Sequence, residues 1–371
     1  MALLREMIQP ASLERCGDRS FPVLSMTMHD GIMLQSDRFK KSLASVDQSA
    51  YKVVRRNQLV VGFPIDEGVL YIQQVADAGI MSPAYDVWNV DETKVDLRYF
   101  ELCLHSPQSM MFYKTNLRGT TARRRSLPKE TLLSLPIPVP SMERQHEIAT
   151  TIGQLKELIE LRRRQLRTLD TLIKARFVEM FGVLPANPMG WETGTIRDVV
   201  SDVRYGSSRP AVEGGRYPYL RMNNITYGGE LDLTDTKQID VPENELEKCT
   251  VRRGDVLFNR TNSKELVGKT CVYNRDEMMV LAGFVIRIRL NNQMLPDFLS
   301  AFLNTDFSKA MLLGMCKTAI GQANINAQEM QGIQIYIPPI ERQAEFVQFK
   351  EQVDKSKVVE CHSTKNTRNA V

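Results

Sequence analysis

The chain of 371 residues contains two copies of one unit, and each copy closes on nearly the same motif. Residues 137–145 read Ile-Pro-Val-Pro-Ser-Met-Glu-Arg-Gln, and residues 335–343 read Ile-Tyr-Ile-Pro-Pro-Ile-Glu-Arg-Gln, which places the final glutamines 198 residues apart. Phe21–Met26 and Tyr217–Met222 match at an offset of 196 residues. Stacked structural repeats have periods of about 20–50 residues, so this offset indicates a duplicated domain. A duplicated domain predicts two similar binding targets at a fixed separation.

Each copy is long enough to bury a core of its own, and its pattern is typical of a mixed α/β (α+β) fold. Val285–Leu290 alternates apolar and polar residues as a strand does, and Val256–Phe258 and Val69–Ile72 are further short strand candidates. Residues 97–105 and 296–304 are expected to be helical. The predicted organisation is a first domain at 1–140, a central helix at 141–182, a second domain at 183–338, and a C-terminal helix with a tail at 339–371.

The segment after the first closing motif has the pattern of a coiled-coil helix. Apolar residues recur every seven positions from Ile152 to Ile173, and a period of 3.5 residues predicts a long helix with one apolar seam. Arg162 and Arg176 fall on this seam. The partner helix is therefore expected to supply an acidic side chain, or to let these arginines reach water.

The C-terminal segment from Ile340 repeats the start of this pattern and predicts a helix of about 20 residues before a polar tail at 362–371. A chain that alternates domain and helix can fold so that its two helices pair antiparallel. The residues expected to form the helix pair are Ile152, Leu155, Ile159, Leu166, Leu169, Ile173, Phe346, Phe349 and Val353.

Recognisable catalytic and metal-binding patterns are absent from the sequence. The six cysteines are scattered, and the four histidines lack metal-ligand spacing. There is no P-loop, no Gly-x-Ser-x-Gly motif and no Asn/Asp-Pro-Pro-Tyr/Phe segment of the kind that amino-methyltransferases use. Asp255 and Glu265 are a weak acid–base candidate, because loop carboxylates are common. We expect a chain that binds rather than reacts, with no catalytic residue, metal or cofactor of its own.

The cysteine pattern also favours a reducing compartment over a disulfide framework. No run of about 18 apolar residues could span a membrane, so a soluble, cytoplasmic protein is expected. The net charge of +4 permits a polyanionic partner without demonstrating one.

Four polar loops of the second copy combine arginine, asparagine and lysine with serine and threonine. Arginine and asparagine can read guanine and adenine edges in the major groove, and hydroxyl groups suit phosphate oxygens. An ordinary polar surface loop is the alternative for each segment alone. The candidate DNA contacts are Arg204, Tyr205, Ser207, Arg209, Arg221, Asn223, Asn224, Arg260, Thr261, Asn262, Ser263, Lys264, Lys269, Gln322, Asn324 and Asn326.

The first copy has two basic segments in the matching regions. Three adjacent arginines after Gly-Thr-Thr are a phosphate-binding candidate, because each neutralised phosphate releases counterions. A charge run is often only a solvated face, which is our interpretation of Arg162–Arg164. The candidates in the first copy are Arg38, Lys40, Lys41, Arg118, Thr120, Arg123, Arg124 and Arg125.

The two closing motifs, the helix ending at Lys174–Gly182 and the loop Arg260–Gly268 together resemble the specificity (S) subunits of type I restriction–modification systems. The resemblance implies two target-recognition domains held apart by an antiparallel helix pair, each reading one half of a bipartite, asymmetric sequence of double-stranded DNA. It also implies two modification (methyltransferase) subunits, which would bind S-adenosylmethionine, and restriction subunits that cleave and translocate DNA with ATP.

The two copies differ at one candidate loop. Gly62–Asp66 in the first copy does not reproduce Asn259–Asn262 in the second, so the two domains should read different sequences. Two other functions remain open on the sequence: a subunit that itself methylates or cuts DNA, and a coiled-coil scaffold whose domains bind proteins.

Overall fold

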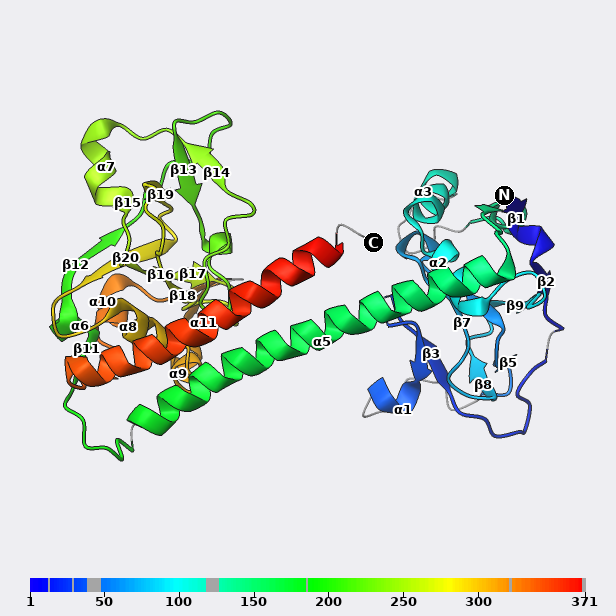
Figure 1. Ribbon diagram of the computed structural model, residues 1–371, viewed down its shortest axis with the longest axis horizontal. Helices are drawn as coiled ribbons and strands as arrows, with labels where there is room; N and C mark the ends of the chain where they lie inside the picture. Colours follow the sequence, from blue (N-terminus) through cyan, green and yellow to red (C-terminus); the bar gives the residue numbers. More distant parts are fainter. Residues whose placement is uncertain are drawn as a thin grey trace. The chain divides into compact units, whose positions relative to one another are not determined.

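The computed structural model describes residues 1–12, 14–28, 30–38, 48–117, 127–184, 186–319 and 322–368, with the side chains of 38, 317–319, 322 and 358–368 left aside. The chain forms two compact units, Met1–Leu158 and Ile159–Val371, which divide within one long helix (Figure 1). In the described part of the chain, no helix is long and apolar enough to cross a membrane.

The first unit contains a four-stranded sheet in the order β2-β9-β6-β7, with the smaller pairs β1-β10, β3-β4 and β5-β8 beside it. Its strands are β1 (Ala2–Leu3), β2 (Ile8–Pro10), β3 (Leu24–Met26), β4 (Ile32–Leu34), β5 (Lys52–Arg55), β6 (Leu59–Val61), β7 (Leu70–Ile72), β8 (Ala78–Met81), β9 (Asp86–Val90) and β10 (Pro136–Ile137). Its helices are η1 (Leu4–Glu6), α1 (Gln35–Arg38), η2 (Ile65–Glu67), α2 (Leu97–Leu104), α3 (Pro107–Asn116) and α4 (Lys129–Leu133).

The second unit contains sheets in the orders β12-β20-β16-β18, β14-β13-β19-β15 and β17-β22-β21, and the pair β11-β23. Its strands are β11 (Thr193–Thr195), β12 (Val200–Tyr205), β13 (Tyr217–Leu220), β14 (Lys237–Ile239), β15 (Thr250–Val251), β16 (Val256–Asn259), β17 (Thr261–Asn262), β18 (Thr270–Val272), β19 (Met279–Leu281), β20 (Val285–Leu290), β21 (Lys317–Ala319), β22 (Gln322–Asn324) and β23 (Gln334–Tyr336). Its shorter helices are α6 (Ile196–Val199), η4 (Met222–Asn224), α7 (Glu243–Cys249), α8 (Pro296–Leu303), α9 (Asp306–Met315) and α10 (Ala327–Gln331).

The duplicated, mixed α and β fold predicted from the sequence is confirmed by the topology. Sheet β2-β9-β6-β7 of the first unit has the same strand order as β12-β20-β16-β18 of the second, and β1-β10 corresponds to β11-β23. The expected helices at 97–105 and 296–304 are α2 and α8, and each is followed by a ten-residue helix, α3 or α9. Strands predicted near 69–72, 256–258 and 285–290 are β7, β16 and β20.

Helix α5 (Met142–Phe181) is 40 residues long, close to the predicted range of 141–182. The predicted seam appears as a stripe of partly buried side chains every three to four residues from Ile152 to Ile173. The helix ends where Gly182 takes φ 76°, a left-handed conformation that glycine adopts without strain.

Helix α11 (Ile340–Arg368) is 29 residues long, so the prediction of about 20 residues was too short. The polar segment after residue 357 contains no proline or glycine, and nothing in its backbone chemistry stops a helix there. Within the second unit α11 runs antiparallel to α5, as expected (Figure 1). Phe346 meets Phe177, while Lys357, further along α11, pairs with Asp170 at 2.6 Å.

The contact between α5 and α11 is centred on aromatic side chains that the heptad pattern did not identify. Phe177 lies 5.2 Å from the ring centroids of both Phe298 and Phe346, and Phe181 lies 5.9 Å from Phe346. Rings at these distances and tilted angles stabilise a core beyond their buried area. The long helices are therefore anchored in the core of the second domain.

The predicted seam residues have mixed outcomes. Ile173 packs against the same core as Phe346, and Val353 is buried. The seam arginine Arg176 receives the expected acid, Glu345 of α11 at 3.9 Å, and its guanidinium also covers the ring of Phe349. The partly buried residues Leu155, Ile159, Leu166 and Leu169 have no partner assigned on α11, whose side chains after Lys357 are not described.

Ile152 belongs to the first unit and lines a cavity there. The prediction that it pairs with Phe346, Phe349 or Val353 was wrong. The reason is register: Phe346 is already packed against Phe177, which is 25 residues further along α5.

Candidate nucleic-acid interface

Three of the predicted polar loops of the second unit meet at the small sheet β17-β22-β21. Thr261 of β17 pairs with Asn324 of β22, and the Ile325 backbone N–H donates to the Arg260 carbonyl at 2.9 Å. The Ala327 N–H donates to the Tyr205 hydroxyl at 2.9 Å. These bonds bring residues that are up to 122 positions apart onto one surface.

Arg260 is held against an aromatic ring at this surface. Its guanidinium carbon lies 4.8 Å from the ring centroid of Tyr205, which is 44% exposed. Among the residues that the structure describes, Arg260 forms no ion pair with a carboxylate. A stacked guanidinium keeps its donors in one plane and loses little freedom when it binds a planar acceptor. Arg260 is therefore positioned to bind an external acceptor.

Arg260 and two residues close to it in the backbone pairing carry buried polar atoms without partners. The Asn259 side-chain nitrogen, Arg260 Nε and Asn324 Oδ1 are buried and have no hydrogen-bond partner in the described part of the chain. Leaving such an atom unpaired costs about 1–3 kcal/mol, so native structures rarely do so without a reason. Asn259 ends β16, Arg260 links β16 to β17, and Asn324 ends β22, which pairs with β17. Arg260 is partly exposed, so it is the strongest candidate in the second unit for contact with base edges, while the side chain of the preceding Asn259 is fully buried.

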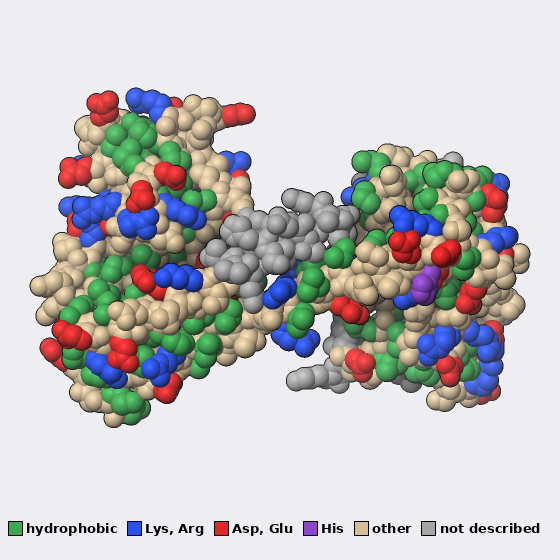
Figure 2. Space-filling view, viewed as in Figure 1, with side chains coloured by type: hydrophobic (Ala, Val, Ile, Leu, Met, Phe, Trp, Pro, Cys, Tyr) green, Lys and Arg blue, Asp and Glu red, His purple; other side chains and the backbone are tan. Residues whose placement is uncertain are grey.

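Other predicted arginines are already paired within the protein. Arg209 binds Glu245 through two nitrogens at 2.8 and 3.2 Å, and these hydrogen bonds hold the pKa of Glu245 below its usual range. Arg221 binds Asp235 at 2.9 Å, and Arg204 binds Asp202 at 2.9 Å. The view in Figure 2 likewise shows blue and red side chains interspersed on the second unit rather than one continuous basic patch.

Four predicted contacts are buried in this structure, and a fifth is engaged as a helix cap, so these five are poor candidates for contact with DNA. The Lys269 amine donates to the Met222 carbonyl at 2.7 Å, and burial lowers its pKa. Asn326 accepts two backbone N–H groups as the N-cap of α10. The sequence could not show that these polar side chains build the loops from inside. The other three buried side chains are Ser207, Asn224 and Thr261, at 8%, 1% and 7% exposure.

The remaining candidates of the second unit lie at or near the surface. Asn223 and Lys264 are exposed. Asn262 and Ser263 are partly exposed, but the Asn262 side chain also accepts the Ser263 N–H at 2.9 Å.

The side chains of Gln322 and Arg38 are not described. Also outside the described residues are Lys40, Lys41, Arg118, Thr120, Arg123, Arg124 and Arg125.

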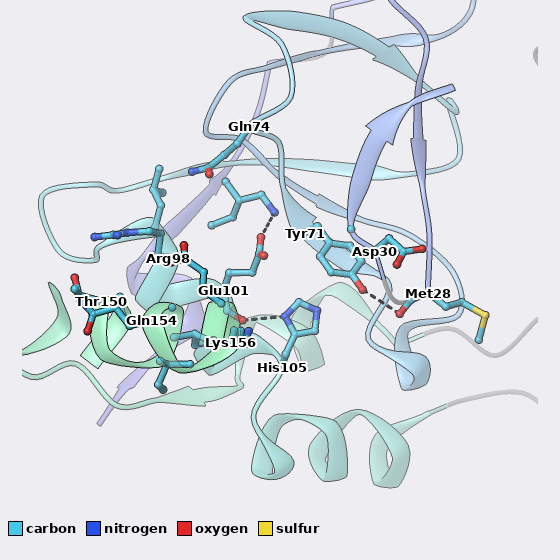
Figure 3. Close-up of a pocket in the computed structure, with 18 residues that line it drawn as sticks. Met28, Asp30, Tyr71, Gln74, Arg98, Glu101, His105, Thr150, Gln154 and Lys156 are labelled. Atoms are coloured by element: carbon cyan, nitrogen blue, oxygen red, sulfur yellow. Dashed lines mark hydrogen bonds between the residues drawn. The ribbon is translucent and has the colours of Figure 1, made fainter. Parts of the chain in front are cut away.

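The first unit has a cavity of about 830 Å³ between α2, β7 and the start of α5 (Figure 3). The Tyr71 ring stacks on His105 at 4.8 Å, and the Tyr71 hydroxyl donates to the Met28 carbonyl at 3.0 Å. The Glu101 carboxylate accepts the Ile72 N–H at 2.8 Å. Acidic and basic side chains are mixed in its lining, so the cavity does not have the character of a phosphate-binding site.

Asp255 and Glu265, the weak acid–base candidate, lie in different environments. Asp255, the acid–base candidate, is buried and binds Arg289 at 2.9 Å, while Glu265 stays exposed. In the described ranges, no group of three or more His, Cys, Asp or Glu side chains could hold a metal ion.

Comparison with known proteins places these features in a family context. Residues 188–367 match the family described as type I restriction modification DNA specificity domain. The chain is 24% identical over 233 residues to the type I restriction enzyme EcoKI specificity subunit of Escherichia coli (strain K12), covering 58% of this chain and 50% of that protein. The chain spans about half the length of the curated relatives it matches.

Solved structures extend the likeness in fold to the whole chain. A structure concerned with complex assembly and conformational transition of the type I R-M system aligns with a TM-score of 0.57 at 16% identity, covering 100% of this chain and 94% of that one. The S subunit of a type I system from M. genitalium aligns with a TM-score of 0.54 at 13% identity, covering 100% and 92%. The chain therefore carries a type I restriction modification DNA specificity domain at residues 188–367, and it resembles type I specificity subunits in fold along its whole length.

Proposed function

We propose that this chain is the DNA-recognition subunit of a type I restriction–modification complex. Each unit reads one half of a bipartite, asymmetric target in double-stranded DNA. The observation that carries the proposal is Arg260, which is stacked on Tyr205 without an acidic partner in the described structure, with an unpaired amide nitrogen on the adjacent Asn259. Planar donors and amide groups of this kind recognise base edges in the major groove.

The duplication supports the bipartite target. The main sheets of the two units share one strand order, while the loops after β6 and β16 differ in sequence. Two related domains with different loops suit two dissimilar half-sites, because the fold sets the approach to the groove and the side chains set the sequence that is read.

In the proposed complex this subunit is not catalytic, and it works in the cytoplasm. Methylation belongs to two modification subunits that bind S-adenosylmethionine, and cleavage with ATP-driven translocation belongs to restriction subunits. Helix α5 offers a docking surface for the modification subunits, because Leu161 and Leu172 are 52% and 46% exposed. At about 100° per residue these two lie about 20° from one another and about 60° or more from the seam residues.

The test is duplex binding by the purified chain. A pool of random duplexes is selected through several rounds, and binding is measured across a range of salt concentrations. We expect enrichment of two short elements at a fixed spacing, with an affinity that falls steeply as salt rises. Failure to enrich any sequence would contradict recognition, and tight binding to protein partners alone would instead support a scaffold.

A further inference from the structure

The first unit has a residue at the position that Arg260 occupies in the second. Strand β6 pairs with β7 so that Val61 opposes Leu70, and β16 pairs with β18 so that Phe258 opposes Thr270. The residue that follows each of these pairs makes the same hydrogen bond. The Gly62 N–H donates to the Val69 carbonyl and the Asn259 N–H donates to the Lys269 carbonyl, both at 2.8 Å.

The two connecting loops both end at a glycine with φ 77°, Gly68 or Gly268, although the loop of the second unit is three residues longer. The matched strand pairs therefore make Phe63 the residue that directly follows the paired segment, as Arg260 is in the second unit. The correspondence rests on backbone hydrogen bonds and not on sequence similarity, since the loops share no motif.

The chemistry at the two positions is opposite. Arg260 offers planar N–H donors beside the aromatic ring of Tyr205. Phe63 offers a hydrocarbon ring that is 50% exposed, with the ring of Tyr85 at 6.1 Å. The neighbouring amide is lost as well, because Gly62 stands in place of Asn259. A Cβ atom at Gly62 would lie 2.4 Å from Met26 Cε, so the fold leaves no room for a side chain there without a shift.

An exposed apolar ring in a base-reading position has a specific partner on DNA. The 5-methyl group of thymine is the apolar feature that base pairs present in the major groove, and phenylalanine is among the side chains that contact it. We propose, on the basis of the function proposed above, that Phe63 contacts the 5-methyl group of a thymine in one half-site, at the position where Arg260 contacts a guanine in the other.

The test uses uracil, which pairs like thymine but lacks the methyl group. The duplex enriched by the wild-type chain is remade with each thymine of either strand replaced in turn by deoxyuridine. Burial of one methyl group predicts about fourfold weaker binding at one such position. Phe63→Ala should bind the thymine duplex more weakly and show no further loss with uracil at that position.

Two matched variants keep the result interpretable. Phe63→Leu preserves an apolar contact and should retain a preference for thymine over uracil. Met111→Ala removes a different exposed apolar side chain of the first unit, 62% exposed on α3, and should keep the full wild-type pattern. Thermal melting of each variant verifies that the first unit is folded.

The outcomes separate this inference from the function on which it rests. If no sequence is enriched, the proposed function fails. If a bipartite sequence is enriched but no uracil position weakens wild-type binding, or if the loss persists in Phe63→Ala, the thymine contact is overturned while DNA recognition stands.

Discussion

Gln145 and Gln343, which lie 198 residues apart, make the same set of hydrogen bonds in the two units. Both side chains are fully buried. Each Oε1 accepts the backbone N–H at the N-cap of a helix, Asp96 at 3.0 Å or Leu295 at 2.9 Å. The glutamine thereby fixes the start of the long helix to its own domain. The carbonyls that accept from Nε2 are Lys94 and Pro140 in the first unit, and Gln293 and Pro338 in the second.

The conserved geometry predicts that Gln343→Leu destabilises the second unit. The change leaves one buried N–H and two carbonyls without their partner, at about 1–3 kcal/mol for each unpaired group. Chemical denaturation of the wild type and the variant measures the loss. Arg342→Ala is the matched control, because Arg342 is exposed and its partner is Glu345 on the same helix. If Gln343→Leu lowers the free energy of unfolding no more than the control does, Gln343 does not hold the helix to its domain.

Arg260→Ala should weaken recognition of one half-site. Loss of a planar contact to a base costs about 1–3 kcal/mol and relaxes selectivity at that base pair. Tyr205→Ala should have a smaller effect in the same direction, because it frees the guanidinium without removing it. Binding to the enriched duplex and to single-base variants measures both. Arg253→Ala, which breaks an exposed pair with Asp276, serves as the control for loss of one positive charge. If Arg260→Ala and Arg253→Ala weaken binding equally, Arg260 does not contact a base.

Replacement of Arg123, Arg124 and Arg125 by alanine should affect DNA binding in a different way from Arg260→Ala. These residues lie outside the described part of the chain, and the prediction rests on their charge. Each phosphate contact contributes about −0.9 to the slope of log affinity against log salt for B-DNA. The triple variant should therefore bind all sequences more weakly and with a shallower salt dependence. An unchanged slope would show that these arginines do not contact phosphates.

Phe346→Ala should separate α11 from α5 in the second unit. The ring is fully buried between Phe177 and Phe181, and truncation of a buried phenylalanine costs about 3–5 kcal/mol. Phe349→Ala should cost less, because that ring is covered by the partly exposed guanidinium of Arg176 rather than by a core. Denaturation midpoints of the two variants test the order, and a larger loss in Phe349→Ala would contradict it.

The buried amine of Lys309 predicts that the folded protein becomes more stable at alkaline pH. Burial lowers its pKa to about 8 from an ordinary value of 10.5, and the charges of Lys174 and Lys269 add to the effect. Between these values the unfolded chain binds more protons than the folded one, so the free energy of unfolding should increase as pH rises from about 8 to 10. Lys309→Met should lack this increment. Denaturation at pH 7 and pH 10 gives the free energies of unfolding of the wild type and the variant. A rise with pH in the wild type that is equal in the variant would contradict the role of Lys309.

Patterns that repeat along the chain were readable from the sequence. The closing motifs, the seam of α5 and the paired helices α2 and α8 follow from local periodicity and from the offset between copies. The role of individual polar residues was not readable. Lys269 and Arg260 lie in the same loop region, yet one amine is turned inward to a carbonyl and the other side chain lies on Tyr205. Their difference depends on contacts with residues 47 and 55 positions away, which no local pattern contains.

The position of Phe63 was missed for a related reason. Its loop shares no motif with Arg260–Gly268, and only the backbone pairing of β6 with β7 reveals the correspondence. Asn259 opens the predicted loop, but only the structure shows that its side chain is fully buried. An unpaired amide nitrogen can be recognised there only in three dimensions.

The most direct test of the central claim is sequencing of methylated DNA from cells that carry this chain with its modification partner. The account predicts methylation at one bipartite, asymmetric motif, with two dissimilar half-sites separated by a spacer of fixed length. Arg260→Ala should relax one half-site and Phe63→Ala the other. A continuous or palindromic motif, a motif indifferent to spacer length, or relaxation of the same half-site by both variants would contradict the account.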